Sequence, residues 1–393
     1  MFYITAGESH GPKITTIISG VPAGLKLDEA TFRNDLSRRQ SGYGRGGRQT
    51  IEKDRAIITS GVRFSKTTGS PISIDILNKD WENWTDIMKH FGNIPPNLVR
   101  EVTPRPGHAD LVGMLKTGSE DARDILERAS ARETAARVAA GSVAREFLAS
   151  VGVEVFSWVN SIGSAKFDDS GLFDFTSNEI PTDLLSRIEF SQVRCPDEAM
   201  SEAMCREIDD AGASGESLGG TFRVVACGLV PGLGTYQTSR KRLTSELGAA
   251  LFSIPAIKCV EFGRGKQVAE ELGTQVHDEI ALSGDDFVRT SNNCGGLEGG
   301  MTNGMPLYVT CAMKPIPTCM NPMLTVNIDT RQVARASKER SDVCAVPACA
   351  VVAEAEVCMT LANAYIEMFG NTCMQDILCN IESYKRRLKT FTK

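Results

Sequence analysis

The sequence predicts an α+β fold rather than a parallel, doubly wound sheet. Segments typical of strands and of helices do not alternate in a regular strand–helix–strand order, which a parallel sheet would require. Hydrophobic residues make up 41% and charged residues 23% of the chain, as in a globular protein with a large core. The length of 393 residues would by itself favour two or three domains.

The N-terminal elements are predicted from β-branched and capping residues. Residues 2–6 (FYITA) and 13–19 (KITTIIS) are predicted strands. Asp28 is a candidate N-cap for a helix that ends near residue 40, with Phe32 and Leu36 at helical spacing. Two β-rich segments follow, residues 55–64 and 70–77, with a turn at residues 65–69 between them.

The helical region over residues 119–150 is predicted to restart at Ser130. Ser130 and Glu133 form an S-x-x-E capping box in front of an alanine-rich run. Farther along, residues 219–231 and 305–313 are predicted strands. Residues 239–254 and 347–369 are predicted helices, the second ended by Gly370.

Composition restricts compartment and partners. No run approaches 18 consecutive apolar residues and no secretory leader is visible, so we expect a cytoplasmic protein with no membrane partner. All twelve cysteines lie at or beyond Cys195 without a C-x-x-C pair, which favours free thiols and no metal site. The net charge of −6 argues against a nucleic-acid partner. A local cationic zone suits a small anionic ligand; its members are Arg33, Arg38, Arg39, Arg45, Arg48, Arg55 and Arg63.

Two short motifs resemble well-known signatures without their context. Gly7-Glu8-Ser9-His10-Gly11 matches G-x-S-x-G, but β-branched residues follow where a serine hydrolase needs a helix. Gly42 to Gly47 matches G-x-G-x-x-G, but it follows a predicted helix rather than a strand. We interpret this second segment as a mobile basic lid for phosphate; a flexible surface loop is the alternative.

The histidines and one helix start offer candidate chemistry. His10 and His108, in glycine-bounded turns, could form an acid/base pair, although most turn histidines are unremarkable surface residues. Ser130 at a helix N-terminus, between Arg128 and Arg132, is a candidate anion site. Asp342 could act in the site or merely cap the last long helix.

These pieces together resemble the chorismate synthase family over nearly the whole chain. The motifs that carry the resemblance occur in order: GESHG (7–11), RRQSGYGRGGRQTIEKD (38–54), SGVRFSKTTGSPI (60–72), RPGHAD (105–110), ERASARETAARVAAG (127–141), NNCGGLEGGMTNG (292–304), KPIPT (314–318) and RSDVCAVPA (340–348). The resemblance implies one domain over residues 1–393, with antiparallel sheets sandwiching a helical layer, assembled as a homotetramer.

The resemblance also implies a reaction. 5-Enolpyruvylshikimate 3-phosphate loses phosphate and its C6 proton in an anti-1,4-elimination that gives chorismate, the last step of the shikimate pathway towards aromatic amino acids. The reaction needs reduced FMN, which the family uses as the base for the C6 proton. NADPH enters only indirectly, for flavin reduction. We expect a monofunctional enzyme that depends on a separate flavin reductase.

Residue roles follow by position from the resemblance. His10 would tune protonation at the N1/O2 edge of reduced flavin, His108 would act near the departing phosphate, and Asp342 would relay a proton at flavin N5. The residues expected to clamp the substrate are Arg39, Arg45, Arg48, Arg105, Arg132 and Arg340. Those expected to line FMN are Arg128, Ala129, Ser130, Pro255, Ala256, Gly299, Lys314, Pro315, Ile316, Pro317, Thr318 and Arg340.

Three positions depart from the family pattern. Ala129 stands where many members have serine, Pro255 replaces a common asparagine, and Cys294 places an oxidisable thiol near the expected site. Two alternatives to the lyase stay open on sequence alone. One is a flavin- or nucleotide-binding protein that has lost the elimination, and the other is a serine hydrolase that uses Ser9.

Overall fold

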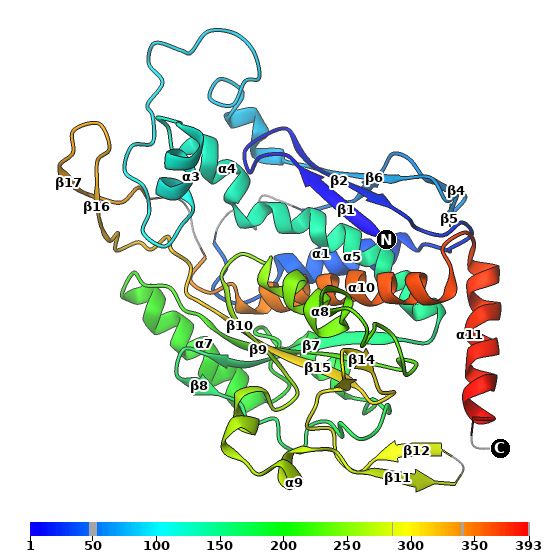
Figure 1. Cartoon of the computed structure of the whole chain (residues 1–393). Helices are drawn as coiled ribbons and strands as arrows, with labels where there is room; N and C mark the ends of the chain where they lie inside the picture. The colour runs from blue at the N-terminus through cyan, green and yellow to red at the C-terminus, as the bar shows by residue number, and fades with distance from the viewer. Residues whose placement is uncertain (47–52, 285, 339–341, 392–393) are drawn as a thin grey trace.

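Two antiparallel sheets enclose a layer of helices (Figure 1). The structure is a computed structural model that describes residues 1–46, 53–284, 286–338 and 342–391. The first sheet has the order β1-β2-β6-β3. Its strands are β1 (Phe2–Ala6), β2 (Lys13–Ser19), β6 (Ile72–Leu77) and β3 (Ile57–Ile58).

The second sheet has the order β10-β15-β9-β7-β8. Val309 pairs with Val224 and Val224 in turn with Ser157, so β15, β9 and β7 are in antiparallel register across the centre of the sheet. Its strands are β10 (Ile257–Phe262), β15 (Leu307–Met313), β9 (Gly220–Cys227), β7 (Glu154–Ile162) and β8 (Ala165–Lys166).

The layer between the sheets consists of α1 (Glu29–Gln40), α5 (Thr134–Ser150), α8 (Leu243–Phe252) and α10 (Val346–Phe369). Helices α5 and α10 approach closely because Gly141 has no side chain: a Cβ there would lie 2.3 Å from the Cβ of Ala355. Helix α10 is long and apolar enough to cross a membrane, but 89% of its apolar window is buried inside the protein. It is therefore the central core helix.

The remaining elements lie around this three-layer body. The helices are α3 (Asp110–Thr117), α4 (Arg123–Ala129), α6 (Leu184–Phe190), α7 (Glu198–Ala213), α9 (Gly273–Val276) and α11 (Met374–Lys389), with short 3-10 segments η1 (Lys79–Asn83), η2 (Ala131–Glu133), η3 (Ser239–Lys241) and η4 (Gly265–Glu270). The hairpins are β4 (Val62–Arg63) with β5 (Lys66–Thr67), β11 (Ile280–Ser283) with β12 (Asp286–Arg289), β13 (Leu297–Glu298) with β14 (Met301–Thr302) and β16 (Leu324–Val326) with β17 (Val333–Arg335).

The α+β prediction is confirmed, and several local predictions hold. Asp28 caps α1 by accepting a hydrogen bond from the Ala30 amide. Ser130 has an extended backbone between α4 and η2, and its side chain accepts from the Arg132 amide, so the helical region does restart there. The predicted capping box with Glu133 is wrong, because the Glu133 carboxylate accepts from Arg137 and Thr5 instead. The turn predicted at residues 65–69 is misplaced. Phe64 and Ser65 both have positive φ and make the β4–β5 turn, while Lys66 already belongs to β5.

Candidate functional site

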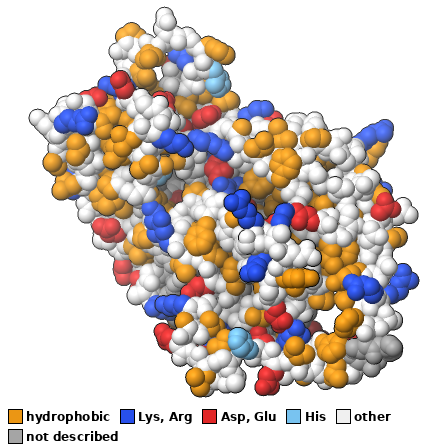
Figure 2. Space-filling model, viewed as in Figure 1, with side chains coloured by type: hydrophobic (Ala, Val, Ile, Leu, Met, Phe, Trp, Pro, Cys, Tyr) orange, Lys and Arg blue, Asp and Glu red, His pale blue; other side chains and the backbone are white. Residues whose placement is uncertain are grey.

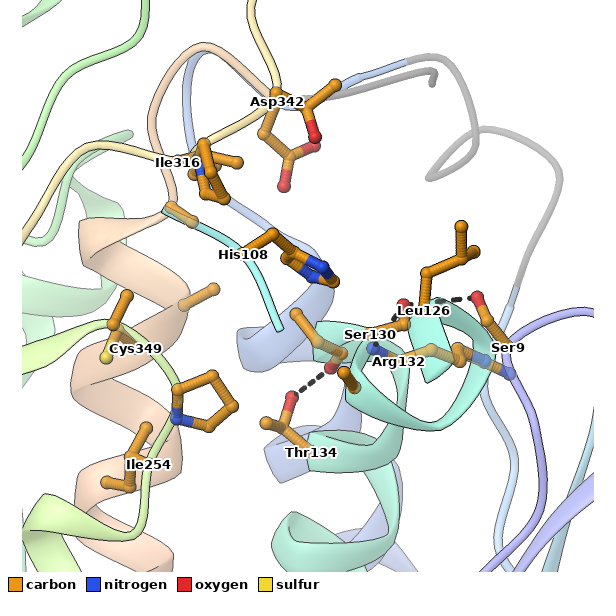
Figure 3. A pocket seen from close by; sticks show the side chains of 18 of the residues that line it. Ser9, His108, Leu126, Ser130, Arg132, Thr134, Ile254, Ile316, Asp342 and Cys349 are labelled. Carbon is orange, nitrogen blue, oxygen red and sulfur yellow. Dashed lines mark hydrogen bonds between the residues drawn. The ribbon is translucent and has the colours of Figure 1, made fainter. Parts of the chain in front are cut away.

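One cavity of about 500 Å³ opens at the end of the helical layer where α10 begins. Figure 3 shows side chains from distant segments facing this space, with His108 between the Cys349–Ile254 wall and the Arg132–Ser9 wall. The contributing segments are the β1–β2 turn, the end of α1, residues 45–46, residues 80–84, the turn before α3, the α4–α5 junction, residues 254–258, residues 313–318, and Asp342 with the start of α10.

Two buried arginines form one side of the cavity. Arg39, on the last turn of α1, donates from Nε to Thr134 Oγ1 at 3.0 Å and from Nη2 to the Ala131 carbonyl at 2.9 Å. Arg132 donates from Nη1 to Asp54 Oδ1 at 2.6 Å. Asp54 also lies 3.5 Å from Nη1 of Arg39, so one buried carboxylate holds both guanidinium groups. Burial lowers the pKa of Arg39 to about 10, with Asp54 opposing and Arg132 adding to the effect.

A third arginine faces the cavity from the glycine-arginine segment. Arg45 Nη1 lies 2.9 Å from Asp342 Oδ2, while the Gly46 amide donates to Asp342 Oδ1 at 2.6 Å. The N-cap of α10 is Ala345, with no side-chain capping bond, so the interpretation of Asp342 as a cap of that helix is wrong. Asp342 instead anchors the segment that carries Arg45.

His10 is held on both its edge and its face. Its Nδ1 lies 2.9 Å from Glu127 Oε1, and its amide donates to Glu127 Oε2 at 2.8 Å. The imidazole stacks on Trp84 with centroids 3.9 Å apart. Burial would raise the pKa of the Glu127 carboxyl, but the bonds from His10 and the charge of Arg123 outweigh it and lower that pKa.

His108 has a similar buried partner. Its Nδ1 lies 2.5 Å from Oδ1 of Asp110, the first residue of α3. Arg105 donates from Nε to Asp110 Oδ2 at 2.9 Å and from Nη1 to Thr318 Oγ1 at 3.0 Å. Burial opposes the charge of Asp110, yet the bonds from His108 and Arg105 hold its pKa well below the usual range.

The opposite wall is apolar with cationic groups at its edge. Ile254, Met313 and Val352 provide the apolar surface. Lys258 and Lys314 also line the cavity, and burial, with Lys258 nearby, lowers the pKa of Lys314. An apolar surface beside several cations fits a ring system that carries anionic substituents.

Comparison with known proteins assigns this arrangement to a family. A chorismate synthase family model matches residues 1–366. Chorismate synthase of Aquifex aeolicus (strain VF5) is 48% identical over 393 residues, 99% of this chain and 98% of that protein. The chain belongs to the chorismate synthase family. Chorismate synthase of Symbiobacterium thermophilum is 49% identical over 99% of both chains. A crystal structure of chorismate synthase superposes with a TM-score of 0.79 at 40% identity, over 99% of this chain and 98% of that one.

Family membership gives the reaction class. The chain is a carbon–oxygen lyase of the shikimate pathway, which forms chorismate by eliminating phosphate from a small-molecule substrate. Membership of this family also implies flavin-dependent catalysis.

Most residues that the resemblance selected do converge on the cavity. They are His10, His108, Asp342, Arg39, Arg45, Arg105, Arg132, Ala129, Ser130, Pro255, Ala256, Lys314, Ile316, Pro317 and Thr318. Arg48, Arg340 and Gly47 of the glycine-rich motif lie outside the described residues, so the lid interpretation stays a prediction.

Some selected residues lie elsewhere. Arg128 is not among the lining residues; it donates to the Thr5 and Gly7 carbonyls and so secures the end of β1. Gly299 lies in the β13–β14 turn, and Pro315 is an exposed neighbour of the lining residues. Cys294 was expected near the site, but it lines a separate cavity of about 300 Å³, where burial raises the pKa of its thiol to about 12.

The structure explains why the G-x-S-x-G match at residues 7–11 is not a hydrolase motif and why Gly44 does not lie in a dinucleotide-binding turn. Ser9 lies in a turn between antiparallel strands β1 and β2, so no helix follows it as a nucleophile elbow requires. His10 Nδ1 is directed to Glu127, and Ser9 Oγ accepts a hydrogen bond from Ser130 Oγ at 3.2 Å. Gly44 accepts from the Val343 amide and precedes no helix within the described residues, which is unlike a dinucleotide-binding turn.

Several residues of the site were not selected from the sequence. Asp54, Glu127 and Trp84 act through contacts between segments far apart in the chain, so their spacing carries no signal. The one signal available was local: Asp54 closes the RRQSGYGRGGRQTIEKD motif and Glu127 opens ERASARETAARVAAG. Both motifs were used for their arginines alone.

Proposed function

We propose that this cavity binds 5-enolpyruvylshikimate 3-phosphate together with reduced FMN and forms chorismate there. The observation that carries the proposal is the convergence of two histidines and four arginines from five segments on one cavity of about 500 Å³. The substrate carries a phosphate and carboxylates, and guanidinium groups bind such anions in bidentate geometry.

The residues that line the cavity fit a flavin. Leu126, Ile254 and Val352 provide apolar contact for a ring, and Trp84 with His10 provides a flat stacked surface. Arg45 Nε is buried with no hydrogen-bond partner among the described residues, so a ligand oxygen would satisfy it. The residues proposed to hold FMN are Ala129, Ser130, Pro255, Ala256, Lys314, Ile316, Pro317 and Thr318, together with Arg340 as implied by the family. Arg128, Gly299 and Pro315, which the family also implies, do not line this cavity.

The chain's own groups divide the remaining chemistry. When bound, reduced FMN supplies the electrons that the elimination borrows and returns, and the base for the C6 proton. Arg39, Arg45, Arg105 and Arg132, with Arg48 and Arg340, bind the anionic groups and stabilise the negative charge on the leaving phosphate. His108 holds a proton for that phosphate, and His10 holds one at the flavin. Asp342 orients Arg45 and relays a proton.

The test is turnover without oxygen. Purified protein, substrate and chemically reduced FMN are mixed under anaerobic conditions, and phosphate and chorismate are measured together. Equal release of both is the expected result. Flavin binding without chorismate, beside a working chorismate synthase, would instead support a binding protein that has lost the elimination.

We also propose the assembly and supply implied by the family: a cytoplasmic homotetramer in which residues 1–393 form one domain, dependent on a separate flavin reductase. One core cluster that includes Ile74, Val143, Val224 and Val357 extends from one sheet through the helices to the other, which supports a single domain. Apolar side chains gather on the lobe with α3 and β16–β17 (Figure 2), and Val112, Leu115 and Val333 there are exposed, which supports association. Light scattering should give four times the chain mass, and NADPH alone should not support turnover.

A further inference from the structure

The two cavity histidines share an arrangement that the family resemblance does not include. Each lies in a turn, and each places Nδ1 against a carboxylate that is almost completely buried. Asp110, at the start of α3, is 0% exposed, and Glu127, on α4, is 2% exposed. Neither carboxylate is among the residues that line the cavity, whereas both histidines are.

The contacts of Asp110 fix which ring nitrogen of His108 carries hydrogen. Asp110 is ionised, because bonds from His108 and Arg105 outweigh burial and keep its pKa well below the usual range. An ionised carboxylate only accepts, so Nδ1 of His108 must donate to it across 2.5 Å. Arg105 Nη2 then donates to Asp110 Oδ1 at 3.2 Å rather than to the histidine 3.1 Å away, since two donors cannot bond to each other.

Glu127 constrains His10 in the same way. Its two oxygens lie 2.9 and 3.1 Å from Nδ1 and also accept from the His10 amide and from Arg123. Stacking on Trp84 fixes the plane of the ring, and the Trp84 indole in turn donates to Asp80. Glu127 therefore sets the proton position from behind the cavity wall, while Trp84, which lines the cavity, sets the ring orientation.

We propose that Asp110 and Glu127 are positioning residues that hold His108 and His10 in the Nδ1–H tautomer, so that each histidine uses Nε2 for proton transfer in the cavity. This inference rests on the proposed function for its catalytic meaning. The tautomers themselves are a property of the ligand-free chain and can be measured without turnover.

The first experiment needs no variant at the site. The full chain has four histidines, so ¹⁵N-histidine labelling gives four ring spin systems. Long-range ¹H–¹⁵N spectra, recorded at a pH where the rings are neutral, distinguish Nδ1–H from Nε2–H rings. His90→Gln and His277→Gln remove the signals of the two histidines that do not line the cavity. Nδ1–H for both remaining rings is expected; an Nε2–H ring for either one overturns the proposal for that histidine.

Each carboxylate then serves as the control for the other. Asp110→Asn is expected to change the tautomer of His108 and leave the spectrum of His10 unchanged, whereas Glu127→Gln should do the reverse. In serine proteases, an Asp→Asn substitution at the buried carboxylate leaves the catalytic histidine in the wrong tautomer and lowers kcat about 10⁴-fold. Here a fall in kcat of about 100-fold or more is expected for each variant, with KM within a few-fold of wild type.

Structural loss and lost positioning are distinguishable. Asp110→Glu and Glu127→Asp keep an acceptor and should restore the Nδ1–H signal and part of kcat. If Asp110→Asn does not fold, the wild-type spectra and Glu127→Gln still decide the matter. Unchanged tautomers in a folded variant with low kcat would refute positioning. Nδ1–H rings in a chain that forms no chorismate would refute the proposed function alone.

Discussion

Two buried glutamates, two residues apart on α10, have pKa values shifted in opposite directions, and a matched pair of substitutions tests the cause of each shift. Glu354 is fully buried and accepts from Arg38, Arg145 and Arg194. Burial opposes its charge, but the three guanidinium groups outweigh burial and hold the pKa of Glu354 at about 2, against an ordinary value of 4.5. Folding therefore favours the ionised form.

The size and sign of the effect follow from linkage. A lowering of the pKa from 4.5 to about 2 corresponds to about 3 kcal/mol of folding free energy. Because the folded value is depressed, this contribution is present above the unfolded pKa and is lost as pH falls through the folded one. Glu354→Gln should thus lower the unfolding free energy by about 3 kcal/mol at pH 7. The deficit should shrink from about pH 4.5 down to about pH 2.

Glu356 is the control on the same helix. Burial raises its pKa, and nearby Glu133 adds to this, against Arg137 and the Tyr3 hydroxyl. Its folded pKa is raised, so wild type loses stability as pH rises above the ordinary value. Glu356→Gln, which mimics the protonated form, should change stability by less than about 1 kcal/mol at pH 7 and gain on wild type with rising pH.

The assay is urea unfolding followed by circular dichroism over a pH series for the wild type and both variants. Opposite pH trends for the two variants are expected. A Glu354→Gln protein as stable as wild type at pH 7, or a deficit that is constant with pH, would show that the arginine cluster does not set this carboxyl group's pKa.

Three further predictions follow from single contacts. Gly141→Ala should lower the unfolding free energy by about 1–3 kcal/mol, because its Cβ would lie 2.3 Å from the facing alanine of α10. Gly248→Ala is the control and should stabilise α8, because its Cβ would have no atom within 4 Å. Thermal melting checks both variants, and an equal change in melting temperature for the two would contradict this prediction. The Ser9→Ala variant should still form chorismate, and a fluorophosphonate probe should not label the wild type. Labelling of Ser9 would support the serine hydrolase hypothesis instead. Arg39→Lys should raise KM about tenfold or more, while Arg33→Lys, at an exposed position, should not; equal KM values would exclude Arg39 from substrate binding.

Local sequence signals predicted the elements that local interactions determine. Asp28 and Ser130 were found because a cap bonds to an amide two residues away. The turn before β5 was misplaced, because Phe64 and Ser65 occupy the left-handed region that favours glycine and asparagine. The register that joins β7 to β9 and β9 to β15 comes from pairing across long stretches of chain, and no local pattern encodes it.

In the site, too, local sequence motifs predicted some residues, whereas residues placed by contacts between distant segments were missed. The cationic residues were predicted because they stand in recognisable motifs, whereas the carboxylates behind them were not. Gly299 was selected with its motif, yet its loop folds into the β13–β14 hairpin away from the cavity lining. A motif therefore identified which residues belong to the family, but only the fold distinguished residues that face the cavity from residues that support it.

The buried carboxylates behind the cavity lining have a physical reason to be there. A cavity that binds a multiply charged anion needs several cations in a poorly solvated space, and each would be unstable there before the ligand arrives. Asp54 balances Arg39 and Arg132, and Asp110 balances Arg105. Glu127 contacts His10, which lines the cavity, and Arg123, which does not.

Because these carboxylates lie outside the cavity lining, they neutralise the cations without occupying the ligand's place. They also fix each guanidinium and imidazole in one orientation, so little reorganisation is needed when substrate binds. Removing a carboxylate should therefore weaken catalysis more than removing a neutral lining residue of similar size, even though the carboxylate never touches the substrate.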